Sequence, residues 1–385
     1  MKYLSQVAKN YPASGIRKMF DLAEKYDDVI KLTVGEPNFD TPVNIKEAAK
    51  KAIDDGFTHY SPNAGLKDLR EVIANKYKGY SDEYTFENVM VTVGALEALT
   101  LTLITTINPG DEVIIPDPCF PNYFGQIMMV GAKPVAVPVY EDNDFMVKAE
   151  DIEKAITPKT KAVLLNSPSN PLGSVMSKEE IIKIAEIADK YDLLVYSDEV
   201  YDKIIFDDKE YFSMAQIPEV RNRVLILNSL SKSHAMTGWR IGYVAGSKEI
   251  ISNMPKLQEG IVSCVSTFTQ KAAIEAITGN QDAVKNMIDE YARRRDILID
   301  GLNNIPGISC KKSPGSFYAF ANIKSFGKTS QEFAEELVKE AKVVVVPGSA
   351  FGEMGEGYLR FVFANSDENL KEAVRRIDKY VRKAY

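Results

Sequence analysis

The polar stretch Asn228-Ser-Leu-Ser-Lys-Ser-His-Ala-Met-Thr-Gly-Trp-Arg240 joins two apolar runs, 224–227 and 241–245. Apolar runs this short, bounded by polar residues, are typical of buried strands. The stretch is therefore expected where two strands leave the core, and it holds one lysine, Lys232, among serines. A lysine beside a buried strand end can lose its proton through desolvation and become a nucleophilic amine.

Groups suited to phosphate binding flank this lysine. Ser229, Ser231 and Arg240 would supply two hydroxyls and a fixed cation, a combination that suits a phosphate dianion. A nucleophilic amine beside a phosphate pocket indicates pyridoxal phosphate. The alternative at this point is a solvated lysine in an ordinary serine-rich loop, so the rest of the chain has to supply the context.

The composition is that of a globular protein, with 45% hydrophobic and 26% charged residues. A chain of 385 residues exceeds the usual size of one core, so two domains are expected. The formal net charge is −7 and no basic tail or stripe is present, which argues against nucleic-acid binding. The N-terminus lacks a signal-peptide core and no segment has the length of a membrane span. We therefore expect a cytoplasmic protein with no membrane partner.

Cysteine and histidine are too few for a metal or disulfide framework. The three cysteines, Cys119, Cys264 and Cys310, are far apart and odd in number. His59 and His234 are the only histidines, which excludes a histidine-rich metal site. No metal is expected.

Glycines mark two places where a ligand could approach the backbone. The loop 34–42 contains two prolines and Gly35, so it is shaped rather than regular, although an interdomain linker is an equal alternative. Gly94 lies between the apolar run 89–93 and a predicted helix. A glycine at such a turn leaves backbone N–H groups free at the positive end of the helix, where an anion can bind, but taken alone this glycine is better explained by a simple tight turn.

Strands and helices alternate through the middle of the chain. Strands are predicted at the apolar runs 89–93, 113–115, 162–165, 193–196 and 224–227, and 178–191 has helical periodicity. This alternation predicts a mainly parallel sheet with right-handed crossovers, and ligands of such sheets bind outside the carboxyl ends of the strands. Polar residues follow the predicted strand ends, namely Asn170, Asp198, Tyr201, Ser229 and Lys232.

The C-terminal part predicts a smaller α+β domain. Strands are expected at 317–321, 343–346 and 358–363, followed by an amphipathic helix from Asp367. The N-terminal arm, with apolar residues at helical spacing, is expected to complete this domain. The predicted division of the chain is an arm and part of the small domain at 1–42, a large pyridoxal-phosphate-binding domain at 43–285, and a small C-terminal domain at 286–385.

Four motifs together resemble those of the class I/II aminotransferases of pyridoxal-phosphate fold type I. They are Ser229-Leu-Ser-Lys232 with Gly238-Trp-Arg240-Ile-Gly242, Asn166-Ser-Pro-Ser-Asn170-Pro-Leu-Gly173, Asp198-Glu-Val-Tyr201 and Tyr358-Leu-Arg360-Phe. The resemblance covers essentially the whole chain, in the right order. It implies an α/β fold with a mainly parallel sheet in a large domain and a smaller α+β domain. Leu172 departs from the small hydroxyl residue that the family often has, which concerns a local turn and no catalytic group.

The resemblance also implies a role for each candidate residue. The catalytic residues would be Lys232, which holds the cofactor and moves the proton, Asp198, which keeps the pyridine nitrogen protonated, and Tyr201. The remaining cofactor-binding residues would be Ala95, Leu96, Phe120, Asn170, Ser229, Ser231, Arg240 and Tyr60, with Tyr60 crossing to the phosphate of the other subunit. The substrate would be bound by Gly35, Asn170 and Arg360, the last through the α-carboxylate.

The implied function is amino-group transfer from an L-amino acid, aspartate or aromatic, to a 2-oxo acid such as 2-oxoglutarate, by a homodimer with shared active sites. An N-acylated diamino acid donor stays open. A pyridoxal-phosphate-dependent carbon–sulfur β-lyase is the alternative activity. A cofactor-sensing regulator is disfavoured because the chain begins almost at the arm, without a basic helix-turn-helix. A purely structural dimer would not need Lys232, Asp198 and Arg360 together.

Overall fold

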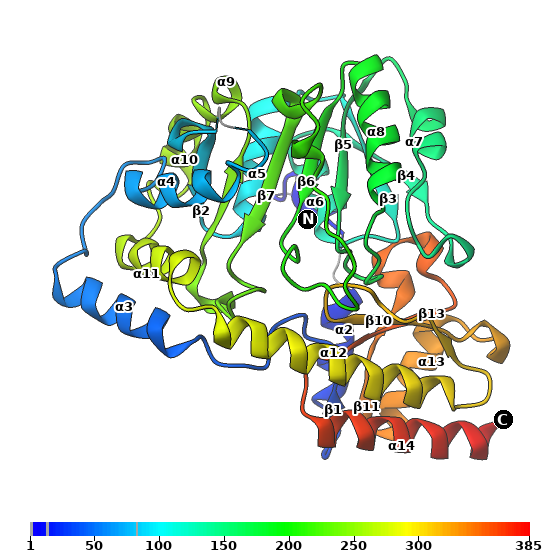
Figure 1. The fold of residues 1–385 in the computed structure, drawn as a ribbon. Coiled ribbons are helices and arrows are strands. Elements are labelled where there is room, and N and C mark those ends of the chain that lie inside the picture. Colours follow the sequence, from blue (N-terminus) through cyan, green and yellow to red (C-terminus); the bar gives the residue numbers. More distant parts are fainter. Residues whose placement is uncertain (1–2, 13–14, 82–83) are drawn as a thin grey trace.

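A seven-stranded sheet forms the centre of the larger part of the protein in the computed structural model, which describes residues 3–12, 15–81 and 84–385 (Figure 1). Its strands in spatial order are β2 (Val89–Thr92), β8 (Gly242–Ala245), β7 (Val224–Ser229), β6 (Leu194–Asp198), β5 (Thr160–Asn166), β3 (Glu112–Asp117) and β4 (Lys133–Pro138). The five strands from β7 to β4 run parallel, while β8 is antiparallel to both β7 and β2. The prediction of a mainly parallel sheet is confirmed.

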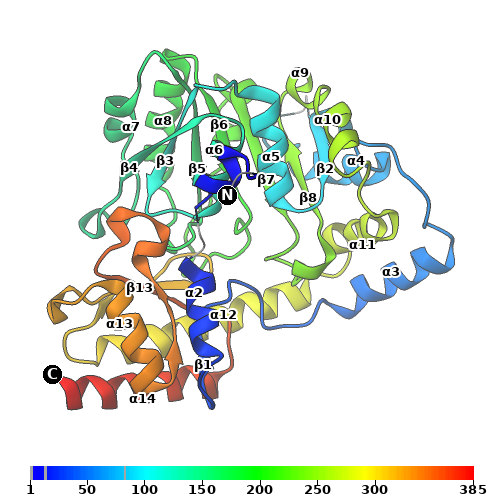
Figure 2. The same cartoon turned by 180° about the vertical axis from the view of Figure 1, so that it is seen from behind.

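Alternate residues of these strands point to opposite faces of the sheet, and both faces are buried. In β7, Val224 and Ile226 pack into one core cluster and Leu225 and Leu227 into another. The first cluster is covered by α3 (Val43–Asp54), α4 (Lys67–Lys76), α7 (Ala149–Ala155), α8 (Lys178–Lys190) and α11 (Thr267–Thr278). The second is covered by α5 (Ala95–Thr106), α6 (Asn122–Met129), α9 (Lys248–Ile251) and α10 (Met254–Ile261), and Figure 2 shows α5 and α6 in front of the sheet.

A third core cluster belongs to the smaller part of the protein, which lies below the sheet in Figure 1. This smaller part contains a four-stranded sheet in the order β12 (Val346–Pro347), β13 (Tyr358–Val362), β10 (Tyr318–Asn322) and β9 (Ser309–Cys310). Three helices pack against this core, namely α12 (Asp282–Asn303), α13 (Ser330–Glu336) and α14 (Asp367–Ala384). The small α+β unit predicted from the sequence is therefore observed.

The N-terminal arm contributes to this third core. Met19 and Ala23 of α2 (Gly15–Ala23) are buried in it, and β1 (Ile30–Lys31) pairs in parallel with β11 (Val343–Val344). The shorter helix α1 (Gln6–Asn10) has no buried residue. The domain boundaries at 42/43 and 285/286 stay predictions, and the second falls within α12.

One strand prediction differs from the structure, and one strand of the large sheet was not predicted. The expected strand 343–346 is split, because Val343 and Val344 pair with the arm whereas Val346 pairs with Arg360 in the other sheet. The strand β4 was not predicted, since its two prolines weaken the strand pattern. At the edge of a sheet a strand tolerates proline because one side needs no hydrogen bond.

Candidate active site

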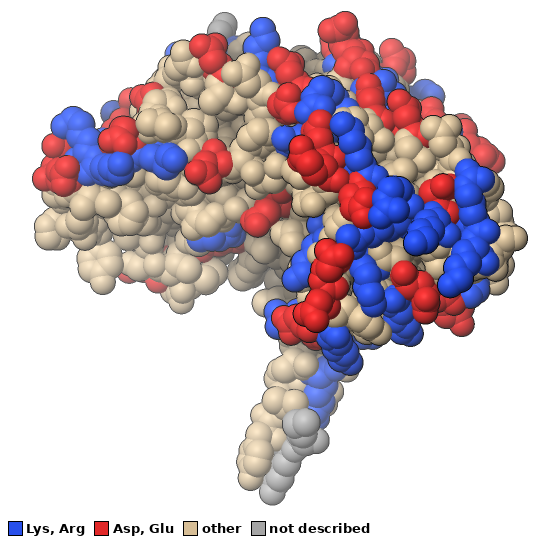
Figure 3. Space-filling view, turned by 90° about the horizontal axis from the view of Figure 1, so that it is seen from below, with Lys and Arg blue, Asp and Glu red and all other residues tan. Residues whose placement is uncertain are grey.

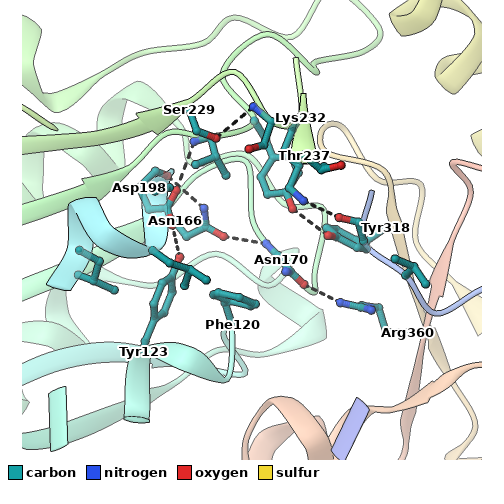
Figure 4. Close-up of a pocket in the computed structure, with 18 of the residues that line it drawn as sticks. Phe120, Tyr123, Asn166, Asn170, Asp198, Ser229, Lys232, Thr237, Tyr318 and Arg360 are labelled. Carbon is teal, nitrogen blue, oxygen red and sulfur yellow. Dashed lines mark hydrogen bonds between the residues drawn. The ribbon is translucent and has the colours of Figure 1, made fainter. Parts of the chain in front are cut away.

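A cavity of about 330 Å³ opens at the carboxyl ends of the parallel strands, between the large sheet and the smaller core (Figure 4). Asn166, Asp198 and Ser229 are the last residues of β5, β6 and β7, so the polar side chains reach the cavity because the strands end there. Every predicted site residue except Tyr60 lines it: Gly35, Ala95, Leu96, Phe120, Asn170, Asp198, Tyr201, Ser229, Ser231, Lys232, Arg240 and Arg360. Tyr60 is 89% exposed and lies beside 264–268 instead.

Lys232 follows β7 and extends its amine into this cavity. The amine donates a hydrogen bond to the carbonyl of Gly35 at 2.5 Å. The pKa of Lys232 is lowered to about 8, mainly by burial; the positive charges of Arg360 and Arg240 act in the same direction, while Glu36 and Asp198 oppose them. A larger fraction of this amine is neutral near pH 7 than of an exposed lysine, which is the state in which it is nucleophilic.

The buried ammonium of Lys232 should cost stability in protein from which cofactor has been removed. Its folded pKa lies below the unfolded value, so the cost is fully present below pH 8 and is relieved as the pH rises through this value, because the folded state loses its proton first. We expect Lys232→Met to raise the free energy of unfolding at pH 7 by about 3 kcal/mol, and this gain to shrink by about 2 kcal/mol at pH 9.5. Urea unfolding of both proteins at the two pH values measures it, and a gain that does not depend on pH would contradict it.

Asp198 is a buried carboxyl group that faces the same cavity. Its Oδ2 accepts a hydrogen bond from the hydroxyl of Tyr123 at 2.6 Å, and its Oδ1 accepts one from the backbone N–H of Val200 at 3.2 Å. Burial raises the pKa of Asp198 to about 6, although these two hydrogen bonds and Lys232 oppose the rise. A cation or N–H donor in the cavity would find a carboxylate that is already oriented and poorly solvated.

The side chain of Asn166 fixes the loop beside this carboxyl group. It accepts a hydrogen bond from the backbone N–H of Asn170 at 2.8 Å and donates one to the backbone carbonyl of Asp198 at 3.0 Å. The ends of β5 and β6 are thereby tied together, as Figure 4 shows. Asn166 thus holds Asn170 and Asp198 at the same edge of the cavity.

The N-terminus of α5 and the guanidinium of Arg240 form an anion-binding corner. Gly94, at φ +82°, precedes the helix, and a Cβ on it would approach Nη2 of Arg240 to 2.7 Å. The Arg240 guanidinium donates to the carbonyls of Thr237 and Val93 and forms no ion pair within the described part of the chain. Because the N–H groups at the start of α5 and this unneutralised cation lie together, the corner suits a phosphate group.

Arg360 is a second guanidinium with neutral partners only. It lies on β13, is 2% exposed, and donates to Oδ1 of Asn170 at 3.0 Å and to the carbonyl of Thr33 at 2.5 Å. Its Nε has no hydrogen-bond partner among the described residues. Burial lowers the pKa of Arg360, yet arginine stays protonated. A buried positive charge without a counter-ion favours a ligand carboxylate, which the guanidinium can bind through two hydrogen bonds.

Several cavity residues were not predicted from the sequence. Tyr123 orients Asp198 and lies three residues after Phe120, so helical spacing could have indicated it. Tyr318 lies on the strand predicted at 317–321, whose apolar and aromatic residues indicated only core packing. Phe20 and Thr237 complete the wall from the arm and from the loop after Lys232.

Two kinds of feature are absent from residues 3–12, 15–81 and 84–385. In these ranges no helix has the length and apolar content that a membrane crossing requires. The same residues contain no group of three or more histidine, cysteine, aspartate or glutamate side chains arranged to hold a metal ion.

The fold and this site define an enzyme of the fold type I transferases, with a mostly parallel sheet and a partly buried lysine at its strand ends. The family model "Aminotransferase class I and II" matches residues 27–377. An aspartate aminotransferase of Pyrococcus abyssi is 46% identical over 373 residues, 96% of each chain. The aromatic-amino-acid aminotransferase 2 of Thermococcus litoralis is 43% identical over 373 residues, again 96% of each chain. The solved aspartate aminotransferase of Rhizobium meliloti superposes with a TM-score of 0.95 at 35% identity, over 98% of each chain.

The chain belongs to the class I and II aminotransferase family. It is therefore an enzyme, an amino-acid aminotransferase, as the sequence motifs predicted.

Proposed function

We propose that this aminotransferase uses pyridoxal phosphate to move the amino group of an L-amino acid, aspartate or aromatic, to a 2-oxo acid such as 2-oxoglutarate. One observation carries the proposal. A single cavity brings together a desolvated lysine, a buried carboxyl group and two guanidinium groups that have no carboxylate partner in the described chain. One guanidinium suits the phosphate of the cofactor and the other suits the carboxylate of the substrate.

The donor groups of the cavity fit the cofactor. Pyridoxal phosphate supplies, when bound, an aldehyde that accepts an amine and a ring that accepts electrons. We assign its phosphate to the N–H groups of Ala95 and Leu96 and to Ser229, Ser231 and Arg240. Asp198 would face the ring nitrogen, Asn170 and Tyr201 the phenolic oxygen, and Phe120 the ring face.

The residues of the chain would then divide the work of transfer. Arg360, with Asn170 and Gly35, binds and orients the substrate through its α-carboxylate. The Lys232 amine, once free and neutral, would remove the proton from the substrate α-carbon and deliver it to the carbon of the cofactor that carried the aldehyde. The depressed pKa of this lysine suits both tasks, because a base near pH 7 must release its proton as readily as it takes one.

The relatives and the walls of the cavity both bear on the identity of the amino donor. The names of the two relatives point to aspartate and to aromatic amino acids. Phe20, Val34 and Tyr318 give the cavity apolar walls, which suits an aromatic side chain. Among the described residues its lining cations are Lys232, Arg240 and Arg360, so a side-chain carboxylate would need another cation. An N-acylated diamino acid stays a third candidate.

We predict that a half-reaction screen will identify the donor. The purified protein, loaded with pyridoxal phosphate, is mixed singly with aspartate, glutamate, phenylalanine, tyrosine, alanine and cystathionine, and the cofactor absorbance and the released oxo acid are measured. Aspartate or an aromatic donor should convert the cofactor to its amine form and release a stoichiometric amount of its oxo acid, and Lys232→Ala should not. Pyruvate and ammonia released repeatedly without an oxo-acid acceptor would instead establish the carbon–sulfur β-lyase.

The proposal includes a homodimer with shared active sites. Val43 is 66% exposed and Tyr60 89% exposed, and Ile261 and Val262 are also exposed apolar residues. In Figure 3 a row of Lys, Arg, Asp and Glu crosses the lobe at the left, with uncharged surface below it, and Lys and Arg lie among Asp and Glu on the lobe at the right. Uncharged surface suits a subunit contact, and mixed charge offers no basic stripe for nucleic acid. Tyr60 would then reach the phosphate of the other subunit. We place the enzyme in the cytoplasm.

A further inference from the structure

Tyr318 is a buried residue of the cavity that lies between two of the proposed site residues. It is on β10, is 1% exposed, and lies on the same side of the cavity as Arg360 in Figure 4. Its hydroxyl is 2.8 Å from the hydroxyl of Tyr201, and the Arg360 guanidinium lies 4.7 Å from the centre of its ring. A Cβ on Gly35 would come within 2.2 Å of the same hydroxyl. One side chain therefore touches Tyr201, Arg360 and the backbone that accepts the Lys232 amine.

The two tyrosine hydroxyls share one hydrogen bond, so one must donate and the other accept. Burial raises the pKa of both. The Arg360 guanidinium opposes this rise in each, and it lies against the ring of Tyr318, 4.7 Å from its centre. A cation in contact with a phenol makes its hydroxyl a better donor, so we take Tyr318 as the donor to Tyr201. When it donates, the proton of Tyr201 stays free for an acceptor inside the cavity.

The ring of Tyr318 has a second effect, on Arg360. The guanidinium contacts this ring and that of Phe351, and the centre of each ring lies 4.7 Å from its central carbon. A buried cation gains from contact with aromatic faces, and the rings restrict the orientation of its plane. The hydrogen bonds to Asn170 and Thr33 then leave Nε without a partner.

We propose that Tyr318 is a positioning residue that acts through two others: its hydroxyl donates to Tyr201 and directs the Tyr201 proton to the phenolic oxygen of the cofactor, while its ring orients Arg360 for the substrate carboxylate. This inference rests on the proposed function of the site. A donor that itself receives a hydrogen bond donates more strongly, so Tyr318 strengthens the bond from Tyr201. Removing the hydroxyl and removing the ring should therefore have separable effects.

The hydroxyl is tested with Tyr318→Phe, which keeps the ring. In the cofactor-loaded protein the apparent pKa of the cofactor absorbance change should rise by about half a pH unit or more, because weaker donation from Tyr201 stabilises the ionised phenolic oxygen less. The KM for the amino donor should stay within about twofold. In a Tyr201→Phe background, Tyr318→Phe should not shift the absorbance pKa further, because the Tyr201 hydroxyl through which Tyr318 acts is absent.

The ring is tested with Tyr318→Leu. It should show the same rise of the absorbance pKa and, in addition, an increase of about tenfold in KM for the amino donor, as expected for a lost cation–π contact in a buried site. The matched control is Tyr358→Phe, a buried tyrosine on the neighbouring strand whose hydroxyl bonds Lys324 and Glu141 outside the cavity. In this variant the apparent pKa of the cofactor absorbance change and the KM for the amino donor should equal those of the wild type.

Three results would overturn the inference. An unchanged absorbance pKa in Tyr318→Phe, or a shift that persists in the Tyr201→Phe background, refutes the role of the hydroxyl. An unchanged KM in Tyr318→Leu refutes the role of the ring. Thermal melting of each variant distinguishes unfolding of the protein from displacement of Tyr201 or Arg360 in a folded protein. If the wild type itself takes up no cofactor and transfers no amino group, the proposed function fails, which is a different outcome from a wild type that works beside silent Tyr318 variants.

Discussion

Lys232→Ala should lower the turnover number by about 10⁴-fold or more, because the variant loses a nucleophile and a proton carrier in one side chain. The amine is the basic group that reaches the carbonyl of Gly35 in the cavity, and burial has already lowered its pKa to about 8. Alanine leaves the fold and the two guanidinium groups in place. Cofactor and substrate should therefore still bind, while the proton transfer between them stops. Steady-state assays with the preferred donor, together with spectra of the cofactor-loaded variant, measure both parts.

Lys203→Ala is the matched control for this substitution. Burial lowers the pKa of Lys203 as well, but its amine bonds Gln281 and does not line the cavity. Its turnover should stay within about twofold of the wild type. Addition of small amines should restore part of the activity of Lys232→Ala, because an exogenous base can enter the space that the side chain vacates. If Lys232→Ala keeps a tenth of the wild-type turnover, the assignment of this lysine is wrong.

Local sequence patterns were sufficient to predict the larger sheet. The runs 162–165, 193–196 and 224–227 are apolar without interruption because both faces of these parallel strands are covered by helices. The edge strand β4 was not predicted, because it contains prolines that an edge position tolerates and a central strand would not. The split of 343–346 was not predicted either, since its cause is a long-range pairing with Ile30 and Lys31 of the arm.

The cavity was predicted where the chemistry follows a strand end and was missed where it depends on packing between the two parts of the protein. Asp198 and Ser229 end strands of one sheet, so their convergence follows from topology. Tyr318 comes from the other sheet and touches Tyr201 because the segment that follows β6 packs into the third core. No periodicity within 317–321 separates this tyrosine from its core neighbours. Such a residue becomes visible once the register of β10 with β13 places it near Arg360.

Asp198→Asn should lower kcat by about 10²–10³-fold, the usual effect of removing one oriented charge from an active site. The amide keeps the size of the side chain and can still accept a hydrogen bond from Tyr123, so the geometry is retained. What it loses is the negative charge that would hold a proton on the ring nitrogen facing it. The KM for the donor should change little, because Arg360, which we propose binds the carboxylate, lies on a different strand. Pre-steady-state rates of the half-reaction with the preferred donor measure the loss.

The neighbouring carboxyl group provides the control for Asp198. Glu199 is also buried and also has a raised pKa, but it accepts hydrogen bonds from Ser197 and Ser213 outside the cavity. Glu199→Gln should therefore leave the half-reaction rate within a few-fold of the wild type. Equal losses in both variants would indicate a general effect of buried charge and refute the specific role of Asp198.

Stability gives an independent check, because the charge of Asp198 should be a cost to the fold when cofactor has been removed. The folded pKa of about 6 exceeds the ordinary value of 3.8, so the folded state binds protons more tightly than the unfolded state, and stability falls as the pH rises between these values. At pH 7 the free energy of unfolding of Asp198→Asn should exceed that of the wild type by up to about 3 kcal/mol. Below pH 4 the two proteins should have the same free energy of unfolding. Denaturant titrations at both pH values measure it. A variant that is more stable and yet nearly inactive would show that the carboxylate is retained for chemistry and not for folding.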